Sequence, residues 1–387
     1  MVNVRILSNP FFIYVISWLG VLFLYSLTWS EVFPALSVSM YLFLFSTFLI
    51  SIMFGIIIHN KRVVRYKPIA SNDRLNITFF LMIIWFGHFF EFLTLGGIPI
   101  VNLIRGITVI HYFDYGIKFF HVVLVSFNSF CVAFFFHKYL SKRKRFYLIA
   151  FVLSIIPSIL IVNRAMFLIS ILTCFFIYLM SLNKHLNLKK ILWISVFTLI
   201  VLYLFGLLGN SRSANNDPNY IPSQSNATEG FMKSGIPKEY FWTYLYGASP
   251  LANFQNNVDK IENVNYNFFD LILFEMTPDI ISKRIASIFG RDKLSHIQIK
   301  PWLTVGSVYS KSFSYVKWFG PILVFLYTLL FILLILGLVN NNSKYHVSTV
   351  AILLVLIFFN TFSNMLVNAG IILQLFFPIT LSFLEKK

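Results

Sequence analysis

Residues 191–209 read ILWISVFTLIVLYLFGLLG, and residues 210–230 continue as NSRSANNDPNYIPSQSNATEG. The first stretch is an unbroken apolar run, long enough for a helix rising about 1.5 Å per residue to cross a lipid core about 30 Å thick. The second stretch is rich in Asn, Ser and Pro, which predicts an irregular and mobile segment. The chain therefore leaves an apolar layer at residue 209 and enters water.

Apolar runs of this kind recur along the whole chain. Hydrophobic residues make up 58% of the sequence and charged residues only 12%, which excludes a soluble globular domain. The runs are continuous rather than alternating, so they indicate helices rather than the strands of a barrel. We expect an all-α, polytopic integral membrane protein. Its predicted transmembrane helices span 11–29, 36–58, 76–95, 119–137, 146–162, 166–182, 191–209, 318–339, 347–367 and 370–384.

Basic residues cluster in alternate connections between these helices. If the N-terminus lies inside, the tracts 61–67, 138–145 and 184–190 all fall on the inner side, together with the basic C-terminal end. This is the positive-inside pattern of membrane proteins, and it predicts that both termini are cytoplasmic. The pattern accounts for the net charge of +17 without a nucleic-acid partner.

The predicted topology divides the chain into three parts. Residues 1–209 form seven helices, residues 210–317 form one large outer loop, and residues 318–387 form the last three helices. Turn and cap signals predict that the loop is partly helical, with one helix over 237–246, a second that opens at Ser249 and Pro250, and a third over 278–289. The third helix ends at Gly290 and is amphipathic, as expected of a helix that lies along a membrane surface.

Two arginines stand on the outer side, where the positive-inside pattern gives no reason for them. Arg164 lies in a tight hairpin between two spans, and Arg212 follows the seventh span. Two guanidinium groups could bind a pyrophosphate in bidentate fashion, with Arg284 and Arg291 completing the site. The alternative is that both side chains reach toward lipid phosphates.

Two residues are candidates for a general base. His296 is the only histidine of the large loop, and a neutral imidazole could take a proton from an acceptor hydroxyl. Glu91 lies within a span, three residues after His88, and a carboxylate in a span is a functional candidate because it is costly there. The alternatives are that His296 has no special role and that Glu91 pairs with Arg105 or Arg164 to hold the bundle together.

The aromatic residues Tyr240, Trp242 and Tyr244 could stack against sugar rings, or they could form an aromatic belt at the depth of the lipid headgroups. Asparagine recurs at every fourth position from the ninth span onward, as Asn360, Asn364 and Asn368. We expect them to form hydrogen bonds between helices, with a polar passage as the alternative.

Some kinds of chemistry have no signal in the sequence. The two cysteines, Cys131 and Cys174, fall within spans and indicate neither a disulfide framework nor a metal site. Neither a glycine-rich phosphate loop nor a Cys/His metal spacing occurs. We therefore expect neither a metal nor a nucleotide cofactor.

The chain resembles the O-antigen polymerases, the Wzy-type oligosaccharide repeat-unit polymerases. The resemblance lies in the number of spans, in the large outer loop of the C-terminal half, and in four short stretches. These are VNRAMFLISIL (162–172), LLGNSRSANN (207–216), YLYGASPLANF (244–254) and WLTVGSVYSKSFSYVKWFGPILVFLY (302–327).

The resemblance implies a GT-C-like glycosyltransferase of the bacterial inner membrane that needs no metal and no nucleotide. Such an enzyme transfers a growing glycan from undecaprenyl pyrophosphate to the non-reducing end of a lipid-linked repeat unit at the periplasmic face. Donor, acceptor and membrane lipid would be its partners, with room for a chain-length regulator. By this resemblance Arg164 and Arg212 would hold the leaving diphosphate, and His296 or Glu91 would act as base.

Three other functions share features with this sequence. An O-antigen ligase that transfers finished glycan to lipid A core uses the same donor and a similar topology. A flippase for lipid-linked oligosaccharides is disfavoured because the spans hold almost no charge and the outer loop is long. A secondary transporter is disfavoured because the sequence has no internal repeat.

Overall fold

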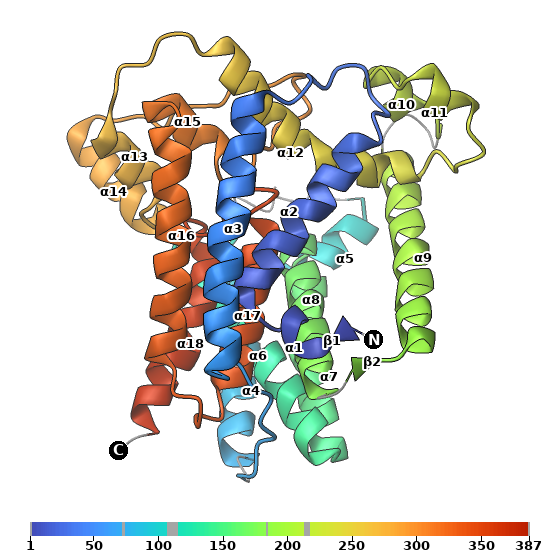
Figure 1. Cartoon of the computed structure of the whole chain (residues 1–387). Helices are drawn as coiled ribbons and strands as arrows, with labels where there is room; N and C mark the ends of the chain where they lie inside the picture. The colour runs from blue at the N-terminus through green and yellow to red at the C-terminus, as the bar shows by residue number, and fades with distance from the viewer. Residues whose placement is uncertain (1, 72–73, 107–114, 183–184, 213–216, 386–387) are drawn as a thin grey trace.

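The computed structural model describes residues 2–71, 74–106, 115–182, 185–212 and 217–385. Within these residues the protein is helical, apart from a pair of two-residue antiparallel strands, β1 (Val2–Asn3) and β2 (His185–Leu186). The helices form an upright bundle with a layer of shorter helices across one end (Figure 1). The prediction of an all-α polytopic membrane protein is confirmed.

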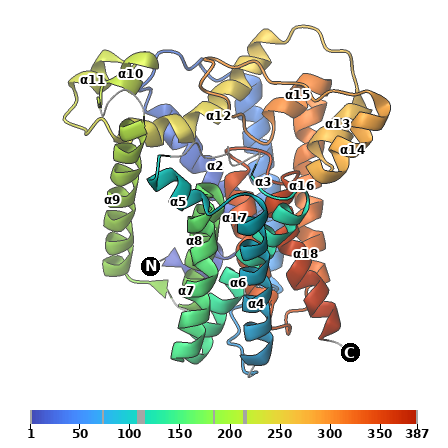
Figure 2. The same ribbon diagram turned by 180° about the vertical axis from the view of Figure 1, so that it is seen from behind.

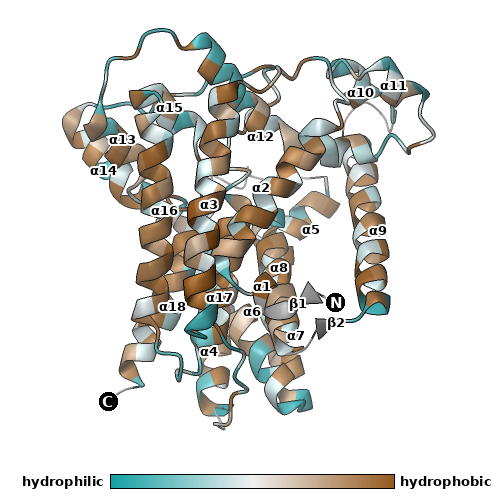
Figure 3. Cartoon of the chain, in the orientation of Figure 1, coloured by the Kyte–Doolittle hydropathy of each residue, from teal (hydrophilic) through white to brown (hydrophobic). Residues whose placement is uncertain are grey.

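Each of the ten predicted spans contains an apolar helix. Six of them are long enough to cross a membrane, and four are shorter apolar helices of the same bundle. The ten are α2 (Pro10–Ser26), α3 (Val38–Asn60), α4 (Arg74–Thr94), α6 (Phe120–Lys142), α7 (Arg145–Leu160), α8 (Arg164–Ser181), α9 (Leu188–Arg212), α16 (Phe319–Leu338), α17 (His346–Phe359) and α18 (Ala369–Leu384). Hydropathy follows the same division, because the apolar colour fills the upright helices and polar residues gather at their ends (Figure 3).

The ninth span is shorter than predicted. Helix α17 ends at Phe359, whereas the apolar pattern predicts a helix to residue 367. The main chain turns because the side-chain oxygen of Asn360 accepts a hydrogen bond from the Met365 N–H at 3.0 Å. Met365 and Leu366 are still buried, which explains why their hydropathy is that of a span. We call residues 360–368 the α17–α18 turn.

Burial differs sharply between helices of the bundle. Every residue of α17 from His346 to Ile357 is buried, and most of α6 is buried as well, so these two helices form the centre of the bundle. Helix α9 is the opposite case, since no residue from Leu188 to Phe205 is buried. It stands apart from the other upright helices in both views (Figures 1 and 2).

Six short and medium helices lie across the end of the bundle, and we call the described residues 217–317 the cap. They are α10 (Tyr220–Gln224), α11 (Glu229–Lys233), α12 (Tyr240–Lys260), α13 (Phe268–Glu275), α14 (Asp279–Phe289) and α15 (Ser310–Val316). Helix α12 bridges the cap, with α10 and α11 on one side and α13 to α15 on the other (Figure 1). A seventh short helix, α5 (Pro99–Ile104), follows α4.

The loop predictions are confirmed in part. Helix α14 ends at Gly290, whose φ of 59° is the left-handed cap that its sequence predicts. The stretch 210–230, predicted to be irregular, contains α10 and the start of α11. The two helices predicted on either side of Ser249 are one helix, α12, which continues through Pro250. Proline removes one main-chain hydrogen bond, and burial of Leu251 and its neighbours on both sides of Pro250 offsets that loss.

Two glycines allow α9 to approach the cap. A Cβ at Gly206 would lie 2.2 Å from the Glu239 carbonyl oxygen, and one at Gly209 would lie 2.5 Å from the Trp242 ring. The contact is also polar, because Trp242 Nε1 donates to Asn210 Oδ1 at 2.7 Å. The cap end of α9 is therefore fixed by the start of α12.

Gly206→Ala tests this close approach. We expect the extra methyl group to destabilise the protein by about 1–3 kcal/mol, because the Glu239 carbonyl must move. Gly337→Ala is the matched control, since this helical glycine of α16 has open space around it and the same change should be neutral or slightly stabilising. Thermal unfolding of the full chain in detergent measures both. Equal unfolding temperatures would contradict the assigned contact.

Candidate functional site

Glu91 lies at the cap end of α4, fully buried, and contacts α6. His121 Nδ1 donates to its two carboxylate oxygens at 2.9 and 3.1 Å, and the Ile117 N–H donates at 3.2 Å. His88 Nδ1 is 3.9 Å from the same carboxylate. The alternative prediction that Glu91 pairs with Arg105 or Arg164 is wrong, because a histidine 30 residues away in sequence takes that place.

The segment before α6 closes over this pair. Gly116 has a φ of 105°, and a Cβ there would lie 2.3 Å from the His121 ring, so only glycine fits. The Tyr115 ring packs edge-on against His121, with the ring centroids 5.6 Å apart. The carboxylate and imidazole are thus enclosed in a dry site, where their mutual interaction is strong.

Arg284 contacts the residue that precedes α6, the helix that carries His121. Its guanidinium lies over the ring of Phe119, 5.8 Å from the centroid, and Phe119 is two residues before His121. The side chain is otherwise exposed. Helix α14 therefore places a cation next to the N-terminus of α6.

Arg164 lies in the hairpin between α7 and α8, as predicted. Asn163 caps α8 through a hydrogen bond from the Met166 N–H at 3.1 Å, and Val162 adopts a φ of 57° to close the turn. Arg164 is the first residue of α8, and its side chain is exposed with no hydrogen bond or ion pair to any described residue. The backbone is held firmly while the guanidinium stays free for another molecule.

Arg212 is the last residue of α9, and its side chain lies outside the described residues. Its main chain is two residues from Asn210, which holds Trp242. Helix α9 therefore ends beside the aromatic residues of α12.

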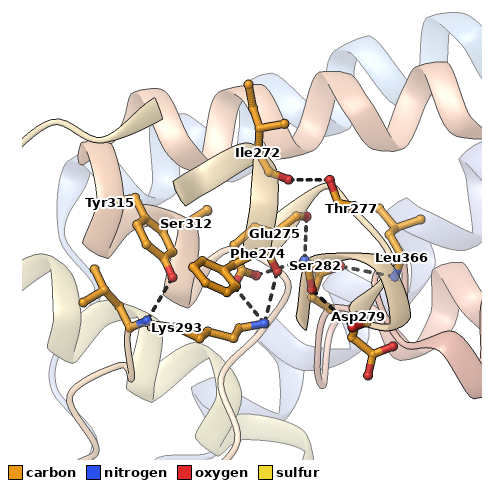
Figure 4. A network of polar contacts seen from close by, with 12 residues as sticks. Ile272, Phe274, Glu275, Thr277, Asp279, Ser282, Lys293, Ser312, Tyr315 and Leu366 are labelled. Carbon is orange, nitrogen blue, oxygen red and sulfur yellow. Dashed lines mark hydrogen bonds and ion pairs between the residues drawn. The ribbon is translucent and has the colours of Figure 1, made fainter. Parts of the chain in front are cut away.

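The cap contains a second polar network at its α13–α15 end (Figure 4). Glu275 is buried, and it receives Lys293 Nζ at 3.2 Å and the Asn364 side-chain amide at 3.0 Å. Arg291 lies 3.7 Å from Asp270, a long and half-exposed ion pair. Arg291 is therefore partly neutralised, unlike Arg164.

This network also fastens the cap to the bundle. Asp279 accepts from the Ala369 N–H at 2.8 Å and donates its own N–H to the Val367 carbonyl at 2.8 Å. The predicted hydrogen bond to another helix is found for Asn364, whose amide donates to Glu275 of α13. Asn360 instead bonds within the α17–α18 turn, to the Met365 N–H, and both asparagines lie in that turn rather than on a helix.

His296 is a buried residue of the extended segment that follows α14. It is 6% exposed, and neither ring nitrogen has a hydrogen-bond partner among the described residues. Burial, and then the neighbouring Lys311 ammonium, lower the pKa of His296 to about 4. Burial and the Lys293 ammonium in turn lower the pKa of Lys311. The imidazole is neutral at pH 7 but far less basic than an exposed histidine.

The three predicted aromatic residues of α12 have different environments. Tyr244 is buried in the core of the cap, where its hydroxyl accepts from the Ser30 N–H at 3.2 Å. The Tyr240 hydroxyl donates to the Leu199 carbonyl of α9 at 3.2 Å. Trp242 alone of the three lines a cavity, which has a volume of about 330 Å³.

That cavity is lined by four separate segments of the chain, each of which contributes at least one aromatic ring. Its lining residues are Tyr220, Ile221, Gln224, Trp242, Leu245, Tyr246, Ser249, Trp302, Leu303, Thr304, Val305 and Phe362. Sequence reasoning missed Trp302 and Phe362, because neither lies in an aromatic cluster of the sequence. No group of three His, Cys, Asp or Glu side chains that could hold a metal ion occurs in the described part of the chain.

These features define a multi-pass membrane protein whose bundle carries a helical cap at one end, with an aromatic cavity in the cap and an exposed arginine, Arg164, in the α7–α8 hairpin. The family model for O-antigen polysaccharide polymerase Wzy matches residues 107–317, which include α6 to α9 and the whole cap. The chain belongs to this family of glycosyltransferase-like polymerases of polysaccharide biosynthesis. No curated protein and no solved structure matches the chain.

The buried His296 predicts a pH dependence of cap stability. Its pKa is about 4 in the folded protein and about 6.5 when exposed, so the unfolded state binds more protons between these values. This contribution to stability is fully present above pH 6.5 and is lost as the pH falls toward 4. Thermal unfolding at pH 7.5, 6 and 5 should show a steeper loss for the native protein than for His296→Gln.

His59→Gln is the control for this measurement, because His59 lies at the opposite end of the bundle on α3. It should leave the native pH dependence in place. If His296→Gln and the native protein lose the same stability as the pH falls from 7.5 to 5, the assignment of His296 as a buried, neutral imidazole is contradicted.

Proposed function

We propose that the protein joins lipid-linked oligosaccharide repeat units on the periplasmic side of the bacterial inner membrane. The donor is a growing glycan on undecaprenyl pyrophosphate, and the acceptor is a second lipid-linked repeat unit. In this proposal the cap faces the periplasm and both termini are cytoplasmic, in agreement with the basic tracts at the ends of the helices away from the cap.

The observation that carries this proposal is the position of Arg164. Its guanidinium is exposed and unpaired among the described residues, at the first residue of α8 and on the cap side of the bundle. The matching family model spans this residue together with the cap. An unpaired guanidinium at that level suits a diphosphate whose lipid tail remains in the membrane.

The transfer follows from the chemistry of the donor. The bond between the anomeric carbon and the diphosphate oxygen breaks, and the acceptor hydroxyl forms the new glycosidic bond at that carbon. Negative charge develops on the departing diphosphate, and fixed cations stabilise it without reorganising during the reaction. Arg164 and Arg212 would bind this leaving group, and Arg284 is a further candidate for the same role. Arg291 is a weaker candidate because Asp270 already neutralises part of its charge.

The acceptor proton needs a base, and the geometry favours the Glu91–His121 pair over His296, with Glu91 orienting the imidazole that takes the proton. His121, in the first turn of α6, is hydrogen-bonded to Glu91, and the Arg284 guanidinium lies over Phe119, two residues before His121. A carboxylate that holds an imidazole in one tautomer is a common arrangement for a general base. His296 has a pKa of about 4 and no carboxylate to orient its ring among the described residues, so it suits this role less well.

Arg164→Ala should leave the protein inserted but reduce surface glycan to single repeats. Loss of one preorganised charge donor typically costs about 3–4 kcal/mol of barrier, or a rate reduced by a factor of about 10²–10³. The measurement is the lipopolysaccharide banding pattern of a deletion strain that carries each variant. Arg212→Ala should behave alike, and Arg164→Lys should restore only part of the ladder, since lysine lacks the planar fork.

Arg145→Ala is the matched control, because this exposed arginine begins the same hairpin at the other end of α7. It should give full-length chains. Full ladders from both Arg164→Ala and Arg212→Ala would sink the diphosphate assignment. If the deletion strain itself showed no repeat at all on its surface glycan, the protein would be a ligase or a flippase instead.

Glu91→Gln should lower the rate of polymerisation at least about 100-fold, because the amide cannot hold His121 as a proton acceptor. His121→Gln should have a similar effect, whereas His296→Gln should keep most activity. The assay is polymerisation by the purified full chain supplied with lipid-linked repeat units. Normal activity of Glu91→Gln together with an inactive His296→Gln would reverse the assignment.

A further inference from the structure

The aromatic cavity of the cap has one wall built on α12. Trp242 is held by its hydrogen bond to Asn210, and its ring centroid lies 6.2 Å from that of Tyr246. Tyr246 in turn stacks on Phe362 of the α17–α18 turn, with centroids 5.9 Å apart and ring planes within 9°. Three aromatic rings from two distant parts of the chain thus form a nearly continuous apolar face.

A second part of the lining, residues 302–305, is an extended segment rather than a helix. Trp302 is 45% exposed, and the Lys300 ammonium lies over its ring, 5.6 Å from the centroid. Asn253 of α12 fixes this segment, because its side chain donates to the Leu303 carbonyl at 2.6 Å and to the Val305 carbonyl at 2.8 Å. The cavity therefore has two anchored aromatic walls before any molecule enters it.

The chemistry of the lining indicates what the cavity can hold. None of its twelve described lining residues is charged. The side chains of Gln224 and Thr304 line it without a hydrogen bond to any described residue, so they are available to a ligand with hydroxyl groups. The volume of about 330 Å³ lies at the lower end of the range of small-molecule sites.

We propose that this cavity binds one uncharged pyranose unit of the lipid-linked oligosaccharide, with the apolar face of the ring against Trp242 or Trp302. This inference rests on the proposed function and adds the class of sugar that the site accepts. A uronic acid would place its carboxylate against aromatic rings with no cation among the described lining residues, to which Lys300 does not belong, and this is unfavourable. A polyisoprenoid tail would leave the polar groups of Gln224 and Thr304 without partners on burial.

Saturation-transfer NMR with the purified full chain in nanodiscs tests the sugar class. The probes are methyl glucopyranoside, methyl N-acetylglucosaminide and methyl glucuronide. We expect binding of at least one of the two neutral glycosides and none of the glucuronide. Trp302→Ala and Tyr246→Ala should each weaken that binding about fivefold, and Trp302→Phe should largely restore it.

Trp193→Ala is the matched control, because this tryptophan is 67% exposed on α9 and lies outside the cavity. It should leave binding unchanged. The proposal is overturned if neither neutral glycoside binds, if the glucuronide binds as well as they do, or if Trp302→Ala and Tyr246→Ala have no effect. It is also overturned if farnesol displaces the bound glycoside, since the cavity would then take the lipid tail.

Surface glycan separates this inference from the proposed function. Trp302→Ala should shift the ladder of the complemented strain toward shorter chains, while Trp302→Phe and Trp193→Ala keep the native ladder. If Arg164→Ala and Arg212→Ala leave the ladder intact but the glycoside results hold, the diphosphate mechanism fails and the sugar site stands. If the arginine variants stop polymerisation and Trp302→Ala changes neither ladder nor binding, the sugar site fails alone.

Discussion

The cap depends on hydrogen bonds between one face of α12 and an irregular main chain. Asn257 accepts from the Ile297 N–H at 3.0 Å and donates to the Ile297 carbonyl at 3.0 Å. Asn253 accepts from the Ile299 N–H at 3.0 Å and donates to the carbonyls of Leu303 and Val305. A buried main chain outside a helix or a sheet must find such partners. An amide side chain supplies both a donor and an acceptor, and the spacing of four residues puts both amides on one helical face. Helix α12 thus supplies the hydrogen bonds that a neighbouring strand would supply in a sheet. These bonds also fix the position of Trp302 in the cavity.

The same extended segment continues into the membrane part of the molecule. Tyr309 is fully buried, its hydroxyl lies 2.8 Å from that of Tyr14, and its ring stacks on Trp18 of α2 at 5.5 Å. The cavity wall and the bundle are thus joined within a few residues. Helix α9 has no buried residue along residues 188–205, and α12 holds it through Tyr240 at the Leu199 carbonyl and Trp242 at Asn210. Arg212 therefore keeps its place relative to the cap rather than to the centre of the bundle.

Hydropathy predicts the ten apolar helices because each one needs a run of apolar residues whatever its neighbours are. It fails where the same composition serves another purpose. Met365 and Leu366 are apolar because they are buried under the cap, and only the hydrogen bond from Met365 to Asn360 reveals that the helix has ended. Pro250 predicts a break in α12 by its local preference, but burial of the helix on both sides outweighs that preference. Both errors are cases in which tertiary packing overrides a local signal.

The candidate site divides along the same line. Arg164 can be found from sequence because the charge pattern of the connections leaves it unexplained, and the structure places it in the predicted hairpin with a free guanidinium. His121 cannot be found in this way, since its relation to Glu91 joins two helices and depends on the left-handed Gly116 between them. The cavity is harder still, because Trp242, Trp302 and Phe362 converge from three segments. A single arginine can be noticed alone, whereas a pair or a wall of rings exists only after the chain has folded. Sites of those two kinds will be missed in other divergent membrane enzymes read from sequence for the same reason.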